Sequence, residues 1–237
     1  MTIDEVKSCA IGVLDFIDSV CKQNGLQYFL CGGTLLGAVR HKGFIPWDDD
    51  IDITMHRKDY ETLMRVLPSE LPAGYKLLCP QSSQYEKSRF LRVINSDGVD
   101  FSENFLDRFH GFPYSCGVDI FPLDGVPDDP EEWDMLQELV RFVINAEDLL
   151  KKTDEDETEK LLSELEQTCR VRFDRSGNIG DQLLTLADTL SQIYSNEDTE
   201  YIVQVGMSEP VKGKYEDTLK PRATRTGSTR TGYITIT

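Results

Sequence analysis

The sequence predicts an α/β (α+β) protein, with a mixed β-sheet core flanked by helices in the N-terminal half and a mainly helical C-terminal half. Three patterns support this fold class. Apolar residues recur at helical spacing over residues 3–23. From Asp50 onward, acidic residues alternate with isoleucine, the period typical of a half-buried strand. From residue 128 to about 196 the pattern is mainly helical.

The first helix is expected over residues 3–23, because start and stop signals flank its apolar positions. Thr2 and Glu5 form a capping-box pattern at the start. Asn24 and Gly25 supply the stop signal at the other end. The helix is therefore defined at both ends by local chemistry as well as by its apolar stripe.

The segment after this helix supplies the strands of the expected sheet. Short strands are predicted, in chain order, at residues 27–31, 50–55, 75–79, 89–94 and 117–121. Small residues that follow the glycine pair favour a short helix to about Arg40, and a second helix is expected at 57–67. This alternation of strand and helix predicts a mixed sheet.

The character of the chain changes after Phe121. Prolines and clustered aspartates predict a loop, and Pro130 occupies the first position of the next expected helix. The end of the chain, rich in Thr, Arg and Gly, has no apolar periodicity and favours a loose tail. We therefore expect a core, a helical region packed on it and a tail, at residues 1–127, 128–205 and 206–237.

The net charge of −17 excludes some partners. Residues 211–237 carry +4, so the first 210 residues carry −21. A nucleic-acid polymer is not expected as a partner, because its binding needs a cationic surface that replaces phosphate counterions. Binding to an anionic membrane by charge alone is disfavoured for the same reason.

The cysteines and the N-terminal residues favour a cytoplasmic protein. The six cysteines include no C-x-x-C pair, and the three histidines have no ligand spacing, so a structural zinc site is not expected. Neither a signal-peptide pattern nor a membrane-spanning apolar run is present in the sequence. Reduced thiols are the simplest interpretation.

The pattern that carries chemistry is a glycine turn followed by paired aspartates. Gly32 and Gly33 follow a predicted strand and precede a helix, which lets backbone N–H groups approach a phosphate, and the Thr34 hydroxyl adds a donor. Asp50 and Asp52 project from one face of a strand, roughly 7 Å apart. Such carboxylates bind Mg²⁺, which prefers oxygen ligands shared with phosphate.

Asp119 is a third acidic residue between apolar neighbours on a predicted strand. It is expected to act either as a further metal ligand or as a base that accepts the proton of an attacking hydroxyl. Two other interpretations remain open for the acidic residues. A run such as 48–50 is often a solvated loop, and a structural Ca²⁺ site would also neutralise buried carboxylates.

Two longer strings resemble the LicD family of phosphocholine transferases, whose core is shared by the fukutin-type ribitol-phosphate transferases. The first consists of GGTLLGAVRH at residues 32–41 and GFIPWDDDID at 43–52, and the second is VDIFPLDGVP at 118–127. The resemblance covers roughly residues 3–127. It implies a nucleotidyltransferase-like fold and transfer of a substituted phosphate from a CDP-linked donor to a sugar hydroxyl, with release of CMP.

The resemblance also implies roles for individual residues. Gly32, Gly33 and Thr34 would hold the donor phosphate, and Arg40 and His41 would neutralise its charge. The metal would be Mg²⁺, with Mn²⁺ as an alternative, held by Asp50, Asp52 and Asp119.

Partners and neighbouring residues follow from the same resemblance. The acceptor would be a sugar or glycolipid, with at most peripheral membrane contact. Trp47 would either border the donor pocket or pack beside Pro46. Arg89 and Arg92 are three apart on a predicted strand, so at most one of them faces the acidic residues, and surface charge on a half-exposed sheet is the favoured interpretation of each. The sequence gives little support for acceptor contacts at His110, Gly111 and Tyr114, in the loop before Asp119.

Two other functions fit the same residues. The first is a nucleotidyltransferase, in which a small molecule attacks the α-phosphate. The second is a non-catalytic relative that binds nucleotide or metal, since residues 220–237 do not match the family's C-terminal segment.

Overall fold

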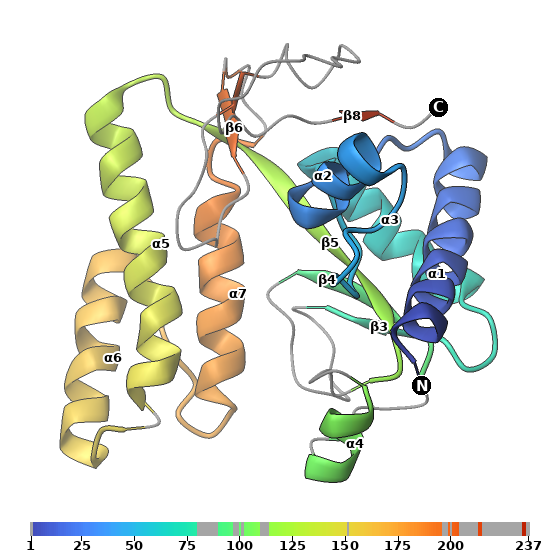
Figure 1. The fold of residues 1–237 in the computed structure, drawn as a ribbon. Coiled ribbons are helices and arrows are strands. Elements are labelled where there is room, and N and C mark those ends of the chain that lie inside the picture. The colour runs from blue at the N-terminus through green and yellow to red at the C-terminus, as the bar shows by residue number, and fades with distance from the viewer. Residues whose placement is uncertain are drawn as a thin grey trace.

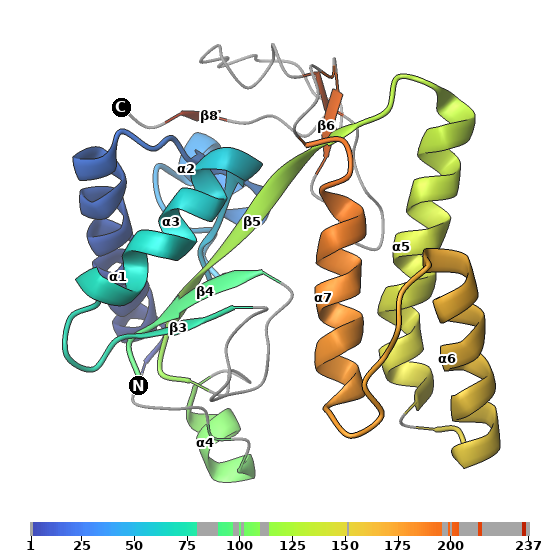
Figure 2. The same ribbon diagram turned by 180° about the vertical axis from the view of Figure 1, so that it is seen from behind.

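A computed structural model of the chain describes residues 2–79, 90–96, 100, 102–109, 114–150, 152–195, 199, 201–203, 213–214 and 234–235. A mixed β-sheet with helices against it forms one part of the molecule, and a layer of three helices lies beside it, with α7 nearest the sheet (Figures 1 and 2). The predicted fold class is confirmed.

The elements follow the expected order. The helices are α1 (Ile3–Asn24), α2 (Gly32–His41), α3 (Arg57–Glu70), α4 (Glu103–Arg108), α5 (Pro130–Leu150), α6 (Glu155–Cys169) and α7 (Ile179–Ser191). The strands are β1 (Phe29–Leu30), β2 (Asp52–His56), β3 (Lys76–Leu78), β4 (Leu91–Ile94), β5 (Gly117–Val126), β6 (Tyr201–Val203), β7 (Gly213–Lys214) and β8 (Ile234–Thr235).

The first helix begins with the predicted capping box. The Thr2 hydroxyl accepts a hydrogen bond from the backbone of Glu5 at 3.3 Å, and the Glu5 carboxylate accepts one from the backbone of Thr2 at 2.7 Å. Gly25 ends the helix in the left-handed conformation, with φ +65°. The buried stripe of α1 then packs with α3 and the sheet in the N-terminal core.

Strand β5 is central to the sheet. The order of strands is β3-β4-β5-β2-β1-β8, with β6 paired to the far end of β5 and β7 paired to β6. β2 and β5 are parallel, and the other pairs are antiparallel. Two short segments of the C-terminal residues 206–237 therefore form strands in the described structure, as β7 and β8.

The predicted strand at 117–121 is too short, because β5 continues to Val126. The prolines after Phe121 had indicated a loop. However, Pro122 remains in the ladder opposite Met55 of β2, and Asp124 to Val126 pair with β6. The distal half of β5 is thus a strand because a segment about 75 residues later in the chain pairs with it.

Two apolar clusters share β5. The first gathers α1, α3 and the sheet, and it includes Val118 and Ile120 of β5. The second gathers α5, α6 and α7, and it includes Val126 at the end of β5 and Val203 of β6. The expected division of the chain into segments stays a prediction.

A buried ionic network joins the two parts, and no sequence pattern pointed to it. Arg57, at the start of α3, binds Asp124 of β5 through its Nε and Nη2 atoms, both at 2.6 Å. Its Nη1 atom donates to Asp188 of α7 at 2.9 Å. The Ser195 hydroxyl also donates to Asp124 at 2.6 Å. α3, β5 and α7 are therefore held by one cation.

The expectation of reduced thiols is wrong for one pair of cysteines. Cys9 and Cys116 form a disulfide between α1 and the residue before β5. They lie 107 residues apart, and they meet only because α1 packs along the sheet, so their spacing carried no signal. Cys21, Cys31 and Cys169 are free thiols. Among the described residues, no helix combines the length and apolar character needed to cross a bilayer.

Candidate active site

The glycine turn is held against the acidic strand by the backbone of Asp52. The Asp52 N–H donates to the Thr34 hydroxyl oxygen at 2.9 Å. The Asp52 carbonyl accepts a hydrogen bond from the N–H of Cys31 at 3.2 Å. Because Thr34 accepts this bond, its own hydroxyl proton can still be donated to a phosphate oxygen. The turn and β2 therefore have a fixed relative position.

Carboxylates lie directly against the two glycines. A Cβ atom at Gly33 would stand 2.5 Å from an oxygen of Asp48, and one at Gly32 would stand 3.4 Å from an oxygen of Asp52. Gly32 also has φ +53°, where a side chain is strained. The glycines thus allow α2 to begin in contact with the acidic residues, and no side chain caps the start of this helix.

Asp52, Asp119 and Arg92 form a row across three strands. Asp119 of β5 is the register partner of Asp52 on β2 and of Arg92 on β4. Paired residues on neighbouring strands project from the same face of a sheet. The row therefore brings two predicted site residues, Asp52 and Asp119, together. It also shows that Arg92 faces the acidic residues, while Arg89 lies outside the described residues.

Arg92 binds both carboxylate oxygens of Asp119. Its Nη2 atom donates to Oδ2 at 2.6 Å, and its Nε atom donates to Oδ1. Burial raises the pKa of Asp119, and the guanidinium opposes this rise. A bidentate, charge-assisted pair of this kind is among the stronger polar contacts in proteins.

A second group of carboxylates lies in the loop before β2. Oxygen atoms of Asp48, Asp49 and Asp50 all lie within 4.8 Å of one another. Asp49, Asp50 and Asp119 line one small cavity together with Tyr114, which is buried. The structure thus brings Asp50 close to the row across the sheet, although β2 begins only at Asp52 and Asp50 belongs to the preceding loop.

Mutual repulsion and burial raise the pKa values of these groups. Burial, followed by the nearby charges of Asp50 and Asp119, raises the pKa of Asp52 to about 7. Burial and contact with Asp48 raise the pKa of Asp50 to about 6. Concentrated carboxylates of this kind need a compensating cation. Their hard oxygen atoms fit the ligand preference of Mg²⁺ or Mn²⁺.

The contribution of Asp48 was missed from sequence. The run of acidic residues had been interpreted as metal ligands only from Asp50 onward, with a solvated loop as the alternative. The signal was present in the three consecutive aspartates, but only the fold shows that the first of them lies against Gly33. Lys7 supports this loop, because its ammonium group donates to the carbonyl oxygens of Ile45 and Pro46 at 3.2 and 2.8 Å.

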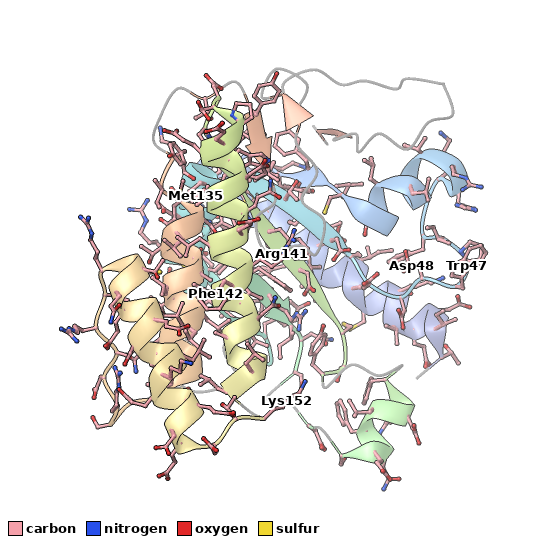
Figure 3. The ribbon with its side chains drawn as sticks, turned by 90° about the vertical axis from the view of Figure 1, so that its left-hand side faces the viewer. Trp47, Asp48, Met135, Arg141, Phe142 and Lys152 are labelled. Atoms are coloured by element: carbon pink, nitrogen blue, oxygen red, sulfur yellow. A yellow bond between two sulfur atoms is a disulfide. The ribbon has the colours of Figure 1, made fainter. Side chains whose placement is uncertain are left out.

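Other predicted residues lie elsewhere. Arg40 and His41 are exposed in the last turn of α2, about 12 Å along the helix axis from the glycine turn. Trp47 is 80% exposed and points outward (Figure 3), so it does not pack beside Pro46. His110 and Gly111 lie outside the described residues.

Gly33→Ala tests the contact between the turn and the acidic loop. The new methyl group would displace the flexible Asp48 side chain, so we expect Mn²⁺ affinity to fall about tenfold, as when a supporting contact of a metal site is lost. The unfolding temperature should stay the same, since Ala favours a helix. Gly43→Ala is the matched control, because nothing lies near its Cβ position. Unchanged Mn²⁺ affinity in Gly33→Ala would show that Asp48 does not belong to the candidate metal site.

Comparison with known proteins finds a family whose domain is similar to the segment that carries this site. Residues 25–133 match the family described as LicD/FKTN/FKRP, nucleotidyltransferase domain. The matched segment contains the glycine turn, the acidic loop, Arg92 and Asp119. The resemblance to the LicD family is thereby confirmed for this segment.

Individual relatives are similar to part of the chain. The lipopolysaccharide cholinephosphotransferase LicD of Haemophilus influenzae is 34% identical over 131 residues, which are 55% of this chain and 48% of that protein. The human ribitol 5-phosphate transferase FKRP is 43% identical over 44 residues, 19% of this chain and 9% of that protein. An uncharacterised protein of Rickettsia prowazekii is 47% identical over 53 residues, 22% of this chain and 20% of that protein. The chain thus spans about half the length of the LicD relative.

Proposed function

We propose that this chain transfers a substituted phosphate, such as phosphocholine, from a CDP-linked donor to a hydroxyl group of a glycan or glycolipid, releasing CMP, because residues 25–133 match a LicD-family nucleotidyltransferase domain. One observation carries the proposal: a glycine turn at a helix start is held by the Asp52 backbone directly beside a group of carboxylates. Relatives named as cholinephosphotransferase and ribitol 5-phosphate transferase support transfer of a substituted phosphate.

The donor phosphates would bind at the glycine turn. The first N–H groups of α2 and the Thr34 hydroxyl can donate to phosphate oxygens, and the helix start favours negative charge. Asp48, Asp50 and Asp52 would hold Mg²⁺ or Mn²⁺ on the other side. When bound, the metal supplies positive charge that stabilises the phosphate oxygens and the departing CMP.

The acceptor hydroxyl would attack the distal phosphorus in line with the bond to CMP. A new bond forms between the acceptor oxygen and phosphorus, and the bond between phosphorus and the CMP oxygen breaks. The hydroxyl proton passes to a carboxylate of the site. Asp119 can serve either as this base or as a metal ligand. The chain's own contribution is to position donor and acceptor and to hold charge where it develops.

Product analysis tests the proposal. We expect CMP and a new sugar phosphodiester, seen by ³¹P NMR, from CDP-choline or CDP-ribitol with Mg²⁺ and a panel of mono- and disaccharides. Release of pyrophosphate from CTP, with a nucleotidyl group left on the acceptor, would show that the reaction is nucleotidyl transfer and would contradict phosphotransfer. Tight binding of CDP-choline without turnover across the panel would contradict catalysis and favour a nucleotide-binding role.

A further inference from the structure

Arg92 binds the carboxylate oxygens of Asp119 that a metal ion would also use. Both oxygens of Asp119 accept hydrogen bonds from its guanidinium. A carboxylate bound to a divalent cation needs at least one of its oxygens for the metal. Each oxygen has two lone pairs and the Arg92 fork takes one on each, so a metal ion can bind Asp119 beside the complete pair only through the lone pairs that remain.

Aromatic rings hold the guanidinium in this place. The Arg92 carbon Cζ lies 5.1 Å from the centre of the Phe90 ring and 5.2 Å from that of Tyr114. Phe90 in turn packs against Phe121 of β5, with ring centres 4.3 Å apart. The paired side chains remain partly accessible, at 22% for Arg92 and 17% for Asp119. The guanidinium is thus held by aromatic rings, while part of the ion pair remains accessible to ions from solvent.

Charge balance gives this arrangement a purpose. Asp52 neighbours Asp119 in the sheet, and Asp50 lines the same cavity as Asp119. Without a metal ion, a guanidinium beside these carboxylates reduces their repulsion. Once a divalent cation neutralises these carboxylates, the guanidinium is no longer needed for that role. An arginine fork matches phosphate oxygens as well as it matches a carboxylate.

We infer that Arg92 and the divalent metal compete for Asp119. In the metal-free protein Arg92 holds Asp119; when the metal binds, Asp119 turns to the metal and the released guanidinium binds the phosphate of the donor. Arg92 is thus a positioning residue that couples metal binding to donor binding. This inference rests on the metal of the proposed function, but it is tested without the transfer reaction.

Mn²⁺ binding, followed by electron paramagnetic resonance without donor, tests the competition. Arg92→Met should bind Mn²⁺ about tenfold or more tightly than the native chain, because a charge-assisted pair no longer has to be broken. The gain should vanish when Asp119→Asn is already present, so the four proteins form a double-mutant cycle. CDP-choline affinity in the presence of Mn²⁺ should fall in Arg92→Met.

The cycle separates competition from a general effect of charge. An equal gain with and without Asp119 would show long-range electrostatics and overturn the inference, as would equal Mn²⁺ affinity in the native chain and Arg92→Met. Absence of Mn²⁺ binding in all four proteins would overturn both this inference and the metal of the proposed function. Thermal unfolding checks that each variant folds. If Arg92→Met does not fold, Arg92→Lys takes its place, with a smaller gain expected because lysine keeps the charge but loses the fork.

Discussion

Asp52→Asn is expected to lower transfer about a thousandfold or more while leaving the fold intact. In the proposed function Asp52 holds the metal, so its loss would remove several kcal/mol of charge stabilisation at the reacting phosphate, and about 4 kcal/mol corresponds to this factor. The hydrogen bonds of Asp52 to Thr34 and Cys31 use backbone atoms, so they survive the substitution. CMP release from CDP-choline measures the effect.

The stability of the same variant provides an internal control. The folded-state pKa of Asp52 is raised to about 7, above the ordinary value of 3.8, so its charged form is disfavoured by folding. The metal-free native chain should therefore become more stable as pH falls through about 7, and neutral Asn should remove this dependence. The unfolding temperature of Asp52→Asn in chelator at pH 8 should equal or exceed that of the native chain.

Asp128→Asn is the matched substitution outside the site, since Asp128 is exposed in the loop before α5. It should retain native transfer. Full activity in Asp52→Asn would remove Asp52 from the metal site, and a large fall in its unfolding temperature would mean that lost activity reports lost structure.

Arg57→Met is expected to lower the free energy of unfolding by about 3–5 kcal/mol, the cost of leaving one member of a buried ion pair without its partner. The substitution leaves the Asp124 carboxylate, which is 0% exposed, without a cationic partner. Among the described residues, the Ser195 hydroxyl then remains as a hydrogen-bond donor to it. It also frees Asp188 of α7 from its contact with α3. Urea denaturation followed by circular dichroism measures the loss.

Two further variants make this result specific to the buried pair. Arg57→Met combined with Asp124→Leu should recover much of the stability, because no isolated charge is left in the core. Lys22→Met should have little effect, since Lys22 is exposed and its ion pair with Asp18, one helical turn away, lies at the surface. A loss in Arg57→Met no larger than that in Lys22→Met would show that the network does not support the junction between the two parts.

The sequence predicted those parts of the fold that depend on neighbouring residues. The start of α1 follows from the Thr2 capping box, and its end follows from Gly25. Helix α3 begins at Arg57 as expected, although it runs three residues further than the predicted end. Each of these signals acts within a few residues, so it can be recognised in a short stretch of sequence without knowledge of the fold.

Features created by long-range pairing could not be predicted. The distal half of β5 exists because β6 pairs with it, and the disulfide of Cys9 exists because α1 crosses the sheet near Cys116. The orientation of Arg92 depends on the register between β4 and β5. For the candidate site, the acidic residues were visible as a motif, but the partner of Asp119 and the contact of Asp48 with Gly33 required the fold.

The attachment of the glycine turn to Asp52 has a consequence for how this site can diversify. Its two hydrogen bonds join backbone atoms of Asp52 to the turn, with a side-chain contribution from Thr34 alone. The distance between the N–H groups of the glycine turn, which are proposed to bind phosphate, and the carboxylates is therefore largely independent of the surrounding side chains. Residues around the cavity can change to accommodate a different head group or acceptor while the reacting centre keeps its dimensions. A single scaffold of this kind can serve enzymes with distinct substrates.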